Sequence, residues 1–257
     1  MGKNKLKKFA DMSTFRCALQ YPREVLLSQG FPFVGKWNGE FFKNPGPVTL
    51  ELGCGKGEYT VALAKANPDR NYIGVDIKGA RMWSGAKEVE ENGIWNAGFL
   101  RAEIENIDKF FAPGEVDEIW ITFPDPQMQK TRKRLTSVRF LEMYGKFLKQ
   151  GGVINLKTDS PFLYEYTRRL AVLNNFEILT ITDDLYGSGM ADPVSSIKTY
   201  YESQWLSRGK KIKLISMRVP DFSGLQEPDS SDIEKDDYRA YPRHTVQKQE
   251  TQNQTAI

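Results

Sequence analysis

The feature that most constrains the fold is a short apolar run that ends in alternating glycines. Residues 48–52 (Val-Thr-Leu-Glu-Leu) have the composition of a buried strand, and a helix-forming segment follows at 58–66. Between them lie Gly53, Gly55 and Gly57. Glycine tolerates positive φ angles and lets a ligand approach the backbone closely. The segment therefore predicts a strand, a turn and a helix of the kind that binds nucleosides in α/β sheets, unless the turn is merely a tight one.

The alternation of strands and helices continues through the chain. Apolar runs predict further strands at 71–76, 98–102, 118–123, 153–157, 176–182 and 211–219, and helical patterns occur at 79–91, 137–148 and 161–174. Strands that alternate with helices form a mostly parallel sheet with helices on both faces. The predicted fold class is therefore α/β, with a doubly wound, mostly parallel sheet of the Rossmann-like type.

Composition divides the chain into a basic N-terminal segment (1–30), one α/β domain (31–220) and an acidic polar tail (221–257). The tail carries eight acidic and four basic residues, which leaves the rest of the chain at +7 although the net charge is +3. Because the tail has few apolar residues, we expect it to be disordered or to hold an interaction segment. Within the domain, residues 31–47 are rich in glycine, proline and aromatic residues, which predicts an irregular lead-in.

The composition also excludes several classes of protein. No apolar run approaches the roughly 18 residues of a membrane helix, and the first residues lack the apolar stretch of a signal peptide. Cys17, Cys54 and His244 are the only cysteines and histidine, too few for a zinc cluster or a disulfide framework. We therefore expect a cytoplasmic protein with no membrane and no metal partner. Its oligomeric state, monomer or homodimer, stays open.

The residues around the glycine turn favour a cationic ligand that lacks phosphate. Asp76 ends the second strand, where an acid can accept hydrogen bonds from the ribose hydroxyls of an adenosine. A dinucleotide-binding turn would have a third glycine where this chain has Glu58, which disfavours a nicotinamide oxidoreductase. Glu51, just before the turn, would repel a pyrophosphate but suits a sulfonium. These residues predict S-adenosylmethionine as the cofactor.

A second motif, Phe123-Pro124-Asp125-Pro126, ends the strand at 118–123 on the same edge of the predicted sheet. Asp125 is therefore expected to face the reactive end of the cofactor. Basic residues cluster behind it at Lys130, Arg132, Lys133 and Arg134, and another basic group lies at Lys3, Lys5, Lys7 and Lys8. Such clusters fit a nucleic-acid backbone, although solvated surfaces also carry them.

Three motifs in order resemble those of the bacterial tRNA (guanine-N7)-methyltransferase family, over roughly residues 48–219. They are the Phe-Pro-Asp-Pro motif with the basic run that ends in Lys133-Arg134-Leu135, the segment 156–159 (Leu-Lys-Thr-Asp), and the segment 197–202 (Ile-Lys-Thr-Tyr-Tyr-Glu). The resemblance implies a class I S-adenosylmethionine-dependent methyltransferase that methylates N7 of a guanine in the variable loop of tRNA.

The resemblance also implies roles for individual residues. The cofactor contacts fall on the glycine turn and on four acids, which are Glu51, Asp76, Glu103 and Asp125. The substrate contacts fall on Lys130, Asp159, Thr199, Tyr200, Tyr201 and Glu202. The family usually has aspartate where this chain has Glu103. The chain also departs from the family after Pro126, where Gln127-Met128-Gln129-Lys130 replaces a tryptophan and a longer basic run, so that either Gln129 or Lys130 takes the place of the family's lysine.

Guanine N7 carries a lone pair and no proton, so its methylation depends on in-line alignment rather than on a strong base. Positive charge reaches the guanine ring as the methyl group is transferred, and carboxylates that accept its N1 and N2 hydrogens would stabilise that charge. We expect Asp159 and Glu202 to accept these hydrogens, and Asp125 to align cofactor and base. In the alternative, Asp159 caps a helix and Glu202 is a surface residue.

Two further classes of function compete with this interpretation. A methyltransferase for another RNA, a small molecule or a protein would share the glycine turn and Asp76 but would not need the basic run after Asp125. An RNA-binding protein without catalysis would not need Glu51, Asp125, Asp159 or Glu202.

Overall fold

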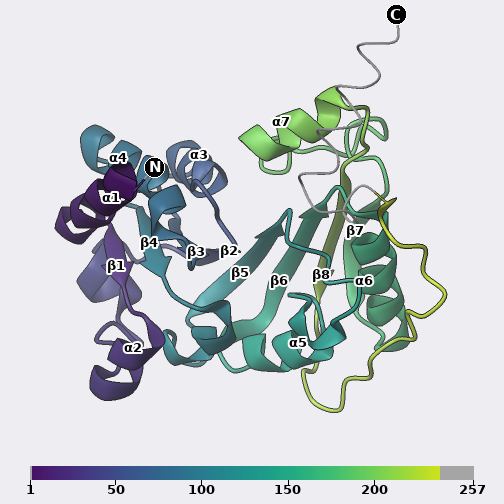
Figure 1. Cartoon of the computed structure of the whole chain (residues 1–257). Helices are drawn as coiled ribbons and strands as arrows, with labels where there is room; N and C mark the ends of the chain where they lie inside the picture. Colours follow the sequence, from purple (N-terminus) through teal and green to yellow (C-terminus); the bar gives the residue numbers. More distant parts are fainter. Residues whose placement is uncertain (1, 238–257) are drawn as a thin grey trace, which may run out of the picture.

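The computed structural model describes residues 2–237, and within them the strands form one eight-stranded sheet (Figure 1). The order is β1-β4-β3-β2-β5-β6-β8-β7. The strands are β1 (Ala18–Gln20), β2 (Val48–Leu52), β3 (Asn71–Asp76), β4 (Ala97–Arg101), β5 (Val116–Thr122), β6 (Leu148–Thr158), β7 (Glu177–Thr182) and β8 (Lys213–Arg218). All pairs from β1 to β6 are parallel, and β8 runs antiparallel to both β6 and β7.

The topology confirms the predicted doubly wound fold. The chain starts the main sheet at β2, continues outward to β3 and β4, and then crosses back to place β5 on the other side of β2. The strand order therefore reverses between β2 and β5. In open α/β sheets this reversal opens a crevice beyond the carboxyl ends of the two strands, which is where ligands bind.

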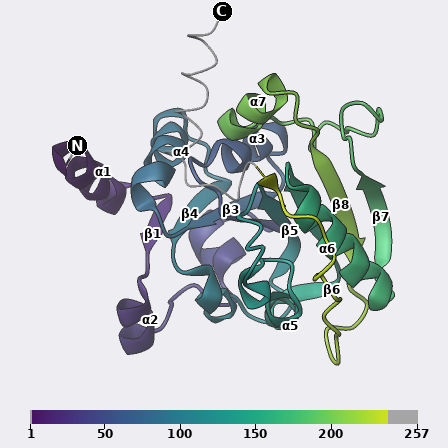
Figure 2. The same cartoon turned by 45° about the vertical axis from the view of Figure 1, so that its right-hand side comes forward.

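Alternate side chains of the strands feed two apolar layers, one on each face of the sheet. Phe99 of β4, for example, packs on one face and its neighbour Leu100 on the other. The first face is covered by α1 (Gly2–Thr14), α3 (Glu58–Ala66), α4 (Gly79–Asn92) and α7 (Tyr200–Ser207). The second is covered by α2 (Arg23–Gln29), the π-helical turn η1 (Trp37–Phe42), α5 (Val138–Tyr144) and α6 (Pro161–Leu173). Figure 2 shows α5 and α6 in front of the strands, and the short 3-10 helices η2 (Ile104–Lys109) and η3 (Thr131–Lys133) complete the fold.

Several elements differ from the prediction. The N-terminal segment is not merely basic: it forms α1, β1 and α2, and β1 extends the sheet beside β4. Met12 of α1 is fully buried, and it follows Phe9 at the three-residue spacing of one helix face. The helix predicted over 137–148 ends at Tyr144, since β6 already begins at Leu148 and includes the glycine pair expected to precede it. The lead-in at 31–47 contains η1, whose Trp37 is buried.

The expectation of a disordered tail needs correction for residues 221–237, which lie against the domain. Ile233 is 8% exposed and belongs to the core, and Asp236 is 4% exposed. The acidic composition suggested a solvated segment, but several of these carboxylates are paired with groups of α5 and α6. Residues 238–257 lie outside the described residues. In the described part of the chain, no helix combines the length and the apolar character needed to cross a bilayer.

Candidate active site

The glycine turn lies at the carboxyl end of β2, where the strand order reverses. Gly53, Gly55 and Gly57 all have positive φ angles, of 82°, 57° and 77°. A Cβ atom at Gly57 would come within 2.4 Å of the Phe99 ring, so this glycine allows close packing of α3 on the sheet. At Gly53, by contrast, a Cβ atom would meet no other atom within 4 Å, so the turn is open toward a ligand. The Asp76 carboxylate accepts a hydrogen bond from the Gly55 amide at 3.1 Å, which joins the turn to β3.

Glu51 is a buried carboxylate beneath this turn, with a side chain held from two sides. One oxygen accepts hydrogen bonds from the amide and the hydroxyl of Thr60, at 3.0 and 2.5 Å, and the other accepts one from the Thr122 hydroxyl at 2.7 Å. These donors are all neutral, and burial raises the pKa of Glu51 above its usual value. A positively charged ligand group beside Glu51 would stabilise its ionised form.

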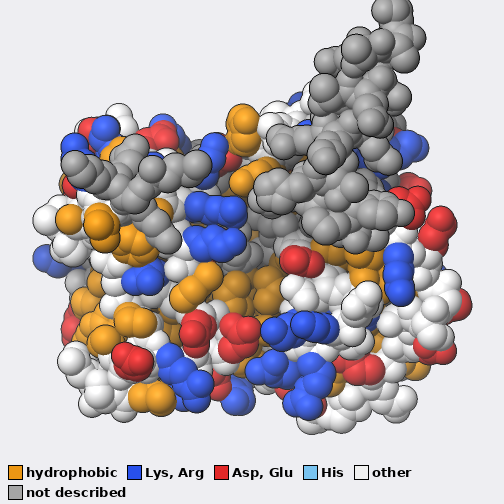
Figure 3. All heavy atoms as spheres, in the orientation of Figure 1, with side chains coloured by type: hydrophobic (Ala, Val, Ile, Leu, Met, Phe, Trp, Pro, Cys, Tyr) orange, Lys and Arg blue, Asp and Glu red, His pale blue; other side chains and the backbone are white. Residues whose placement is uncertain are grey.

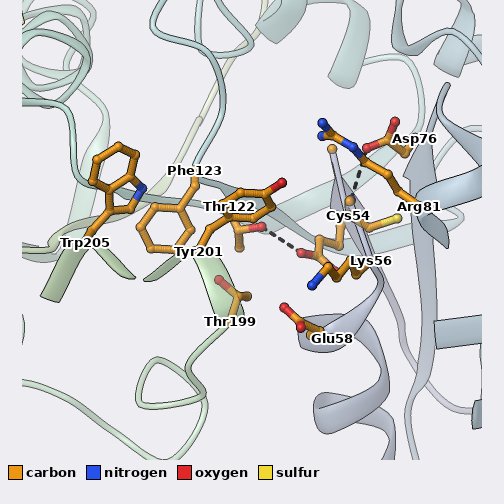
Figure 4. A pocket seen from close by; sticks show the side chains of 13 residues that line it. Cys54, Lys56, Glu58, Asp76, Arg81, Thr122, Phe123, Thr199, Tyr201 and Trp205 are labelled. Atoms are coloured by element: carbon orange, nitrogen blue, oxygen red, sulfur yellow. Dashed lines mark hydrogen bonds between the residues drawn. The ribbon is translucent and has the colours of Figure 1, made fainter. Parts of the chain in front are cut away.

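Two cavities with shared lining residues lie along the carboxyl edge of the sheet, and together they are called the trough. The first cavity lies between the glycine turn and α7, and Figure 4 shows Lys56 and Glu58 facing Thr199 and Tyr201 across it. The second extends past the ends of β3, β4 and β5. Both parts are lined by Gly53, Asp76, Arg81 and Phe123. On the face seen in Figure 3, Lys and Arg side chains gather near the centre and below it, beside acidic and hydrophobic ones.

Three of the acids predicted to contact the cofactor come together in the second cavity. Asp76 ends β3, Glu103 follows β4 and Asp125 follows β5. The Glu103 carboxylate accepts a hydrogen bond from Asn106 at 3.1 Å, and the exposed Asp125 accepts one from the Gln127 amide at 3.0 Å. The described residues hold no cluster of His, Cys, Asp and Glu side chains arranged for a metal ion.

The wall opposite the glycine turn comes from α7, which the sequence did not predict as a helix. Thr199 caps its first turn, and Tyr201 and Trp205 also line the cavity (Figure 4). Tyr200 points elsewhere: its side chain is 51% exposed, and the Lys56 ammonium lies 4.1 Å from the centre of its ring. Trp205 also packs against the apolar core, and nothing in the sequence distinguished it as a residue that would line the cavity.

Phe123, Lys56 and Arg81 are lining residues that the sequence reasoning missed as ligand contacts. For Phe123 the motif offered a signal, because it directly precedes Pro124. Its backbone has a φ of 50°, which is unfavourable for a phenylalanine and turns the chain sharply at the end of β5. Gln127 is similarly strained, with a φ of 46°. Strained residues of this kind tend to occur at functional sites.

Glu202 does not line either cavity of the trough, and its predicted contact with the guanine stays a prediction. Its side chain is fully buried and lies 2.8 Å from the ammonium of Lys157, which is itself fully buried. The Tyr186 hydroxyl donates to the same carboxylate at 2.6 Å, and Glu202 also completes a capping box with Thr199. Burial lowers the pKa of Lys157, and the charge of Glu202 opposes that shift. All contacts of this carboxylate are thus internal, and the surface position considered as its alternative is excluded.

Asp159 and part of the basic run are less exposed to solvent than predicted. The Asp159 side chain is 1% exposed, just after β6. Burial lowers the pKa of Lys213, and the charge of Asp159 opposes that shift. The cap of α6 is Ser160, whose hydroxyl accepts from the Leu163 amide, so the alternative of Asp159 as the capping residue is wrong. Lys130 and Gln129 are both exposed, and neither lines the two-part trough. Arg134 is buried, so the basic run does not act as a single surface patch.

Comparison with known proteins decides the family. A family profile described as "Putative methyltransferase" matches residues 45–215. A protein of Bacteroides thetaiotaomicron is 54% identical over 95% of this chain and 96% of its own length. One of Porphyromonas gingivalis is 56% identical over 90% of this chain and 96% of its own. Both are named tRNA (guanine-N(7)-)-methyltransferase. The chain belongs to the tRNA (guanine-N7)-methyltransferase family.

Solved structures agree with this assignment at the level of the fold. The 16S rRNA methyltransferase KamB aligns with a TM-score of 0.56 at 15% identity, over 74% of this chain and 95% of its own. An antibiotic-related methyltransferase aligns with a TM-score of 0.52 at 19% identity, over 71% and 92%. The protein therefore has the class I methyltransferase fold, as the sequence predicted, with β1 and the residues after β8 as additions to the part matched by the family profile.

Proposed function

We propose that this member of the tRNA (guanine-N7)-methyltransferase family transfers the methyl group of S-adenosylmethionine to N7 of a guanine in the variable loop of tRNA. The observation that carries the proposal is the trough at the strand reversal. One wall of the trough is an open glycine turn above a buried carboxylate, and the other presents Thr199, Tyr201 and Trp205. This arrangement suits a cationic nucleoside on one side and a base on the other.

The residues of the turn fit S-adenosylmethionine. Asp76 would accept the ribose hydroxyls, because it lines both parts of the trough. Glu51 has neutral hydrogen-bond donors and a raised pKa, so a cationic group is the partner it lacks. The open space at Gly53 would admit the ligand next to the backbone. When bound, S-adenosylmethionine supplies an electrophilic methyl group, and the protein supplies its alignment.

The residues on the substrate side have to orient a base without removing a proton from it, since N7 carries none. Tyr201 and Trp205 provide aromatic surface, and Phe123 adds a third ring at the end of β5 (Figure 4). Asp125 would offset the positive charge that develops on the guanine, because its carboxylate lies exposed at the edge of the second cavity. Asp159 remains a proposed contact of the guanine edge. Because its side chain is buried, this contact requires the surrounding segment to move.

The RNA backbone would be bound by the exposed lysines and arginine near the second cavity. Lys130, Arg132 and Lys133 are exposed on and beside η3, and Lys133 also lines the cavity. Contacts with phosphates release counterions, so each is lost as salt concentration rises. We therefore expect tRNA affinity to fall steeply with salt, whereas affinity for S-adenosylmethionine should change little.

The proposal is tested by locating the transferred methyl group. The protein is incubated with S-adenosylmethionine labelled in its methyl group and with unmodified tRNA, and the RNA is digested to nucleosides for mass spectrometry. Label in 7-methylguanosine at one variable-loop position is the expected result. Label at another base, or only in small acceptors offered in parallel, would contradict the proposal. The Asp125→Asn variant serves as the matched control for methyl transfer that does not depend on the site.

A further inference from the structure

The segment after β8, residues 221–237, forms a C-terminal strap along α6. Figure 1 shows it as the yellow chain that climbs beside this helix toward the carboxyl edge of the sheet. Gln226 and Asn174 exchange two hydrogen bonds at the carboxyl end of α6, at 2.8 and 2.9 Å. Near the middle of the helix, Asp232 pairs with Arg169 at 2.7 Å. The strap thus runs antiparallel to α6 and ends near the start of that helix.

Two carboxylates of the strap bind the first turns of two helices. Glu227 accepts a hydrogen bond from the Val138 amide of α5 at 3.0 Å. Asp236 accepts one from the Phe162 amide of α6 at 3.0 Å and another from the Ser160 hydroxyl. Amide groups in the first turn of a helix have no partner within the helix, and negative charge there is favourable. Of the seven acidic residues in this segment, Glu227, Asp232 and Asp236 therefore make contacts with α5 or with α6 and its cap.

The strap also reaches the loop that carries Asp125. Arg134 is 1% exposed, and its guanidinium donates to the carbonyls of Gln127 and Met128, at 3.3 and 3.0 Å. The same guanidinium donates to the hydroxyl of Ser230 in the strap, at 3.1 Å. The Asp236 amide in addition donates to the sulfur of Met128 at 3.2 Å. Arg134 thus joins the strap to the backbone just after Asp125.

The backbone held in this way is the strained part of the site. Gln127 has a positive φ angle, and its amide donates to the Asp125 carboxylate. Such a conformation persists only where the surroundings support it. Ser160, bound by Asp236, directly follows Asp159, so the same end of the strap also supports the second proposed carboxylate. Both supports come from a segment outside the residues matched by the family profile.

We propose that the C-terminal strap positions the site for methyl transfer. Through Arg134 the strap holds the backbone of the Asp125 loop, residues 123–130, and through Asp236 it holds the turn at Asp159. This inference rests on the proposed function for its effect on catalysis. The strap acts through the backbone that orients the carboxylates and needs no contact of its own with cofactor or substrate. Misplacement of reacting groups by about 1 Å can lower a rate by roughly a hundredfold, so support of this kind has a measurable effect.

The test compares two aspartates of the strap in the full-length protein. Asp236→Ala removes the contacts at the start of α6, whereas Asp232→Ala removes an exposed ion pair that contributes little. We expect Asp236→Ala to increase deuterium uptake in residues 123–130 and 158–163, and to lower kcat/KM for tRNA by about tenfold to a hundredfold at unchanged Kd for S-adenosylmethionine. Asp232→Ala should resemble the wild-type protein in both measurements. Asp236→Asn, which keeps an acceptor for the helix, should restore most of the loss.

Equal deuterium uptake in the Asp125 loop of the Asp236→Ala and Asp232→Ala variants would overturn the inference, even if Asp236→Ala melts at a lower temperature. Ser230→Ala gives a second test if Asp236→Ala does not fold, since it removes only the hydroxyl that Arg134 binds. It should raise exchange in the Asp125 loop and leave residues 158–163 unchanged, and a loop that exchanges at the wild-type rate would again refute the proposal. If the wild-type protein fails to methylate tRNA, the proposed function is wrong, but exchange still decides whether the strap supports the loop.

Discussion

Replacing Lys157 by methionine isolates what the buried ion pair contributes to the α7 wall. The ammonium contacts Glu202 and also donates to the carbonyls of Ser195 and Ile197, at 2.6 and 2.9 Å. Methionine is unbranched like lysine and fills similar space, but it donates no hydrogen bond. Removing one partner of a buried pair leaves an uncompensated charge and costs about 3–5 kcal/mol. At roughly 2–4 °C per kcal/mol for a chain of this size, Tm should fall by about 6–20 °C.

The double variant Lys157→Met/Glu202→Gln separates charge from packing. Glutamine still suits the third position of a capping box, and no uncompensated charge remains in the double variant. It should therefore be more stable than Lys157→Met alone by about 1–3 kcal/mol, which is the cost of leaving a buried polar group unpaired. The control is Lys149→Met, which breaks a surface ion pair with Asp117 at 3.1 Å and should cost at most about 1 kcal/mol.

Urea unfolding of the four proteins, followed by tryptophan fluorescence and circular dichroism, provides the free energies. Coincident transitions from the two probes would justify a two-state treatment. If Lys157→Met loses no more stability than Lys149→Met, the ion pair does not anchor α7. If the double variant is less stable than Lys157→Met, the uncompensated charge is not the source of the loss, and the reasoning from charge is refuted.

Three further predictions concern the trough itself. Asp125→Asn keeps an oxygen for the Gln127 amide, so it should retain the fold and cofactor binding while kcat falls by about tenfold to a hundredfold in single-turnover assays; wild-type turnover would refute its role. Asp159→Ala should reduce the preference for guanine over inosine, which lacks the N2 amino group, at the target position of otherwise identical tRNAs; an unchanged preference would exclude Asp159 as an N2 acceptor. Burial raises the pKa of Glu51, so protonated protein must release a proton to bind a cationic cofactor, and affinity for S-adenosylmethionine should increase as pH rises through that pKa. Calorimetry in buffers of different ionisation enthalpy measures this release, and Glu51→Gln should abolish it; an unaltered pH dependence in that variant would contradict the assignment.

The sequence was sufficient for the sheet and for the edge at which the site lies. Strands β2 and β3 begin and end at the predicted residues, because each strand coincides with a short apolar run in the sequence. Since parallel strands place their carboxyl ends on one edge, the order of the motifs was enough to bring Asp76, Glu103 and Asp125 into one cavity. Neither step requires knowledge of a contact between distant side chains.

The sequence was insufficient where a residue's role depends on a distant partner. Glu202 and Lys157 lie 45 positions apart. They meet because β8 pairs antiparallel with β6, so that α7, which precedes β8, lies at the carboxyl end of β6. Ser160 and Asp236 are 76 positions apart, so nothing near either residue indicates that they pair. The charge pattern also gave a wrong prediction for Arg134. A basic run predicts a solvent-exposed side chain, but this guanidinium packs against the rings of Phe162 and Tyr166. In each case the local pattern identified a polar residue and left its partner undetermined.

The glycine turn, the α7 wall and the Asp125 loop are held by different kinds of interaction, so substitutions should disturb them to different degrees. The glycine turn is tied to the sheet by the main chain, since the amides of Gly53 and Cys54 both donate to the carbonyl of Val75, at 2.8 and 3.0 Å. The α7 wall depends on a buried ion pair, and the Asp125 loop depends on Arg134 and the strap. Side-chain substitutions can remove the second and third supports, but they leave these two main-chain hydrogen bonds of the turn in place. Variants of Lys157 and Asp236 should therefore affect the two ligands differently. They loosen the groups proposed to orient the base, while the glycine turn that binds the cofactor keeps its backbone hydrogen bonds. An enzyme whose reaction needs alignment more than proton transfer would lose turnover through that loss of alignment, at nearly constant cofactor affinity.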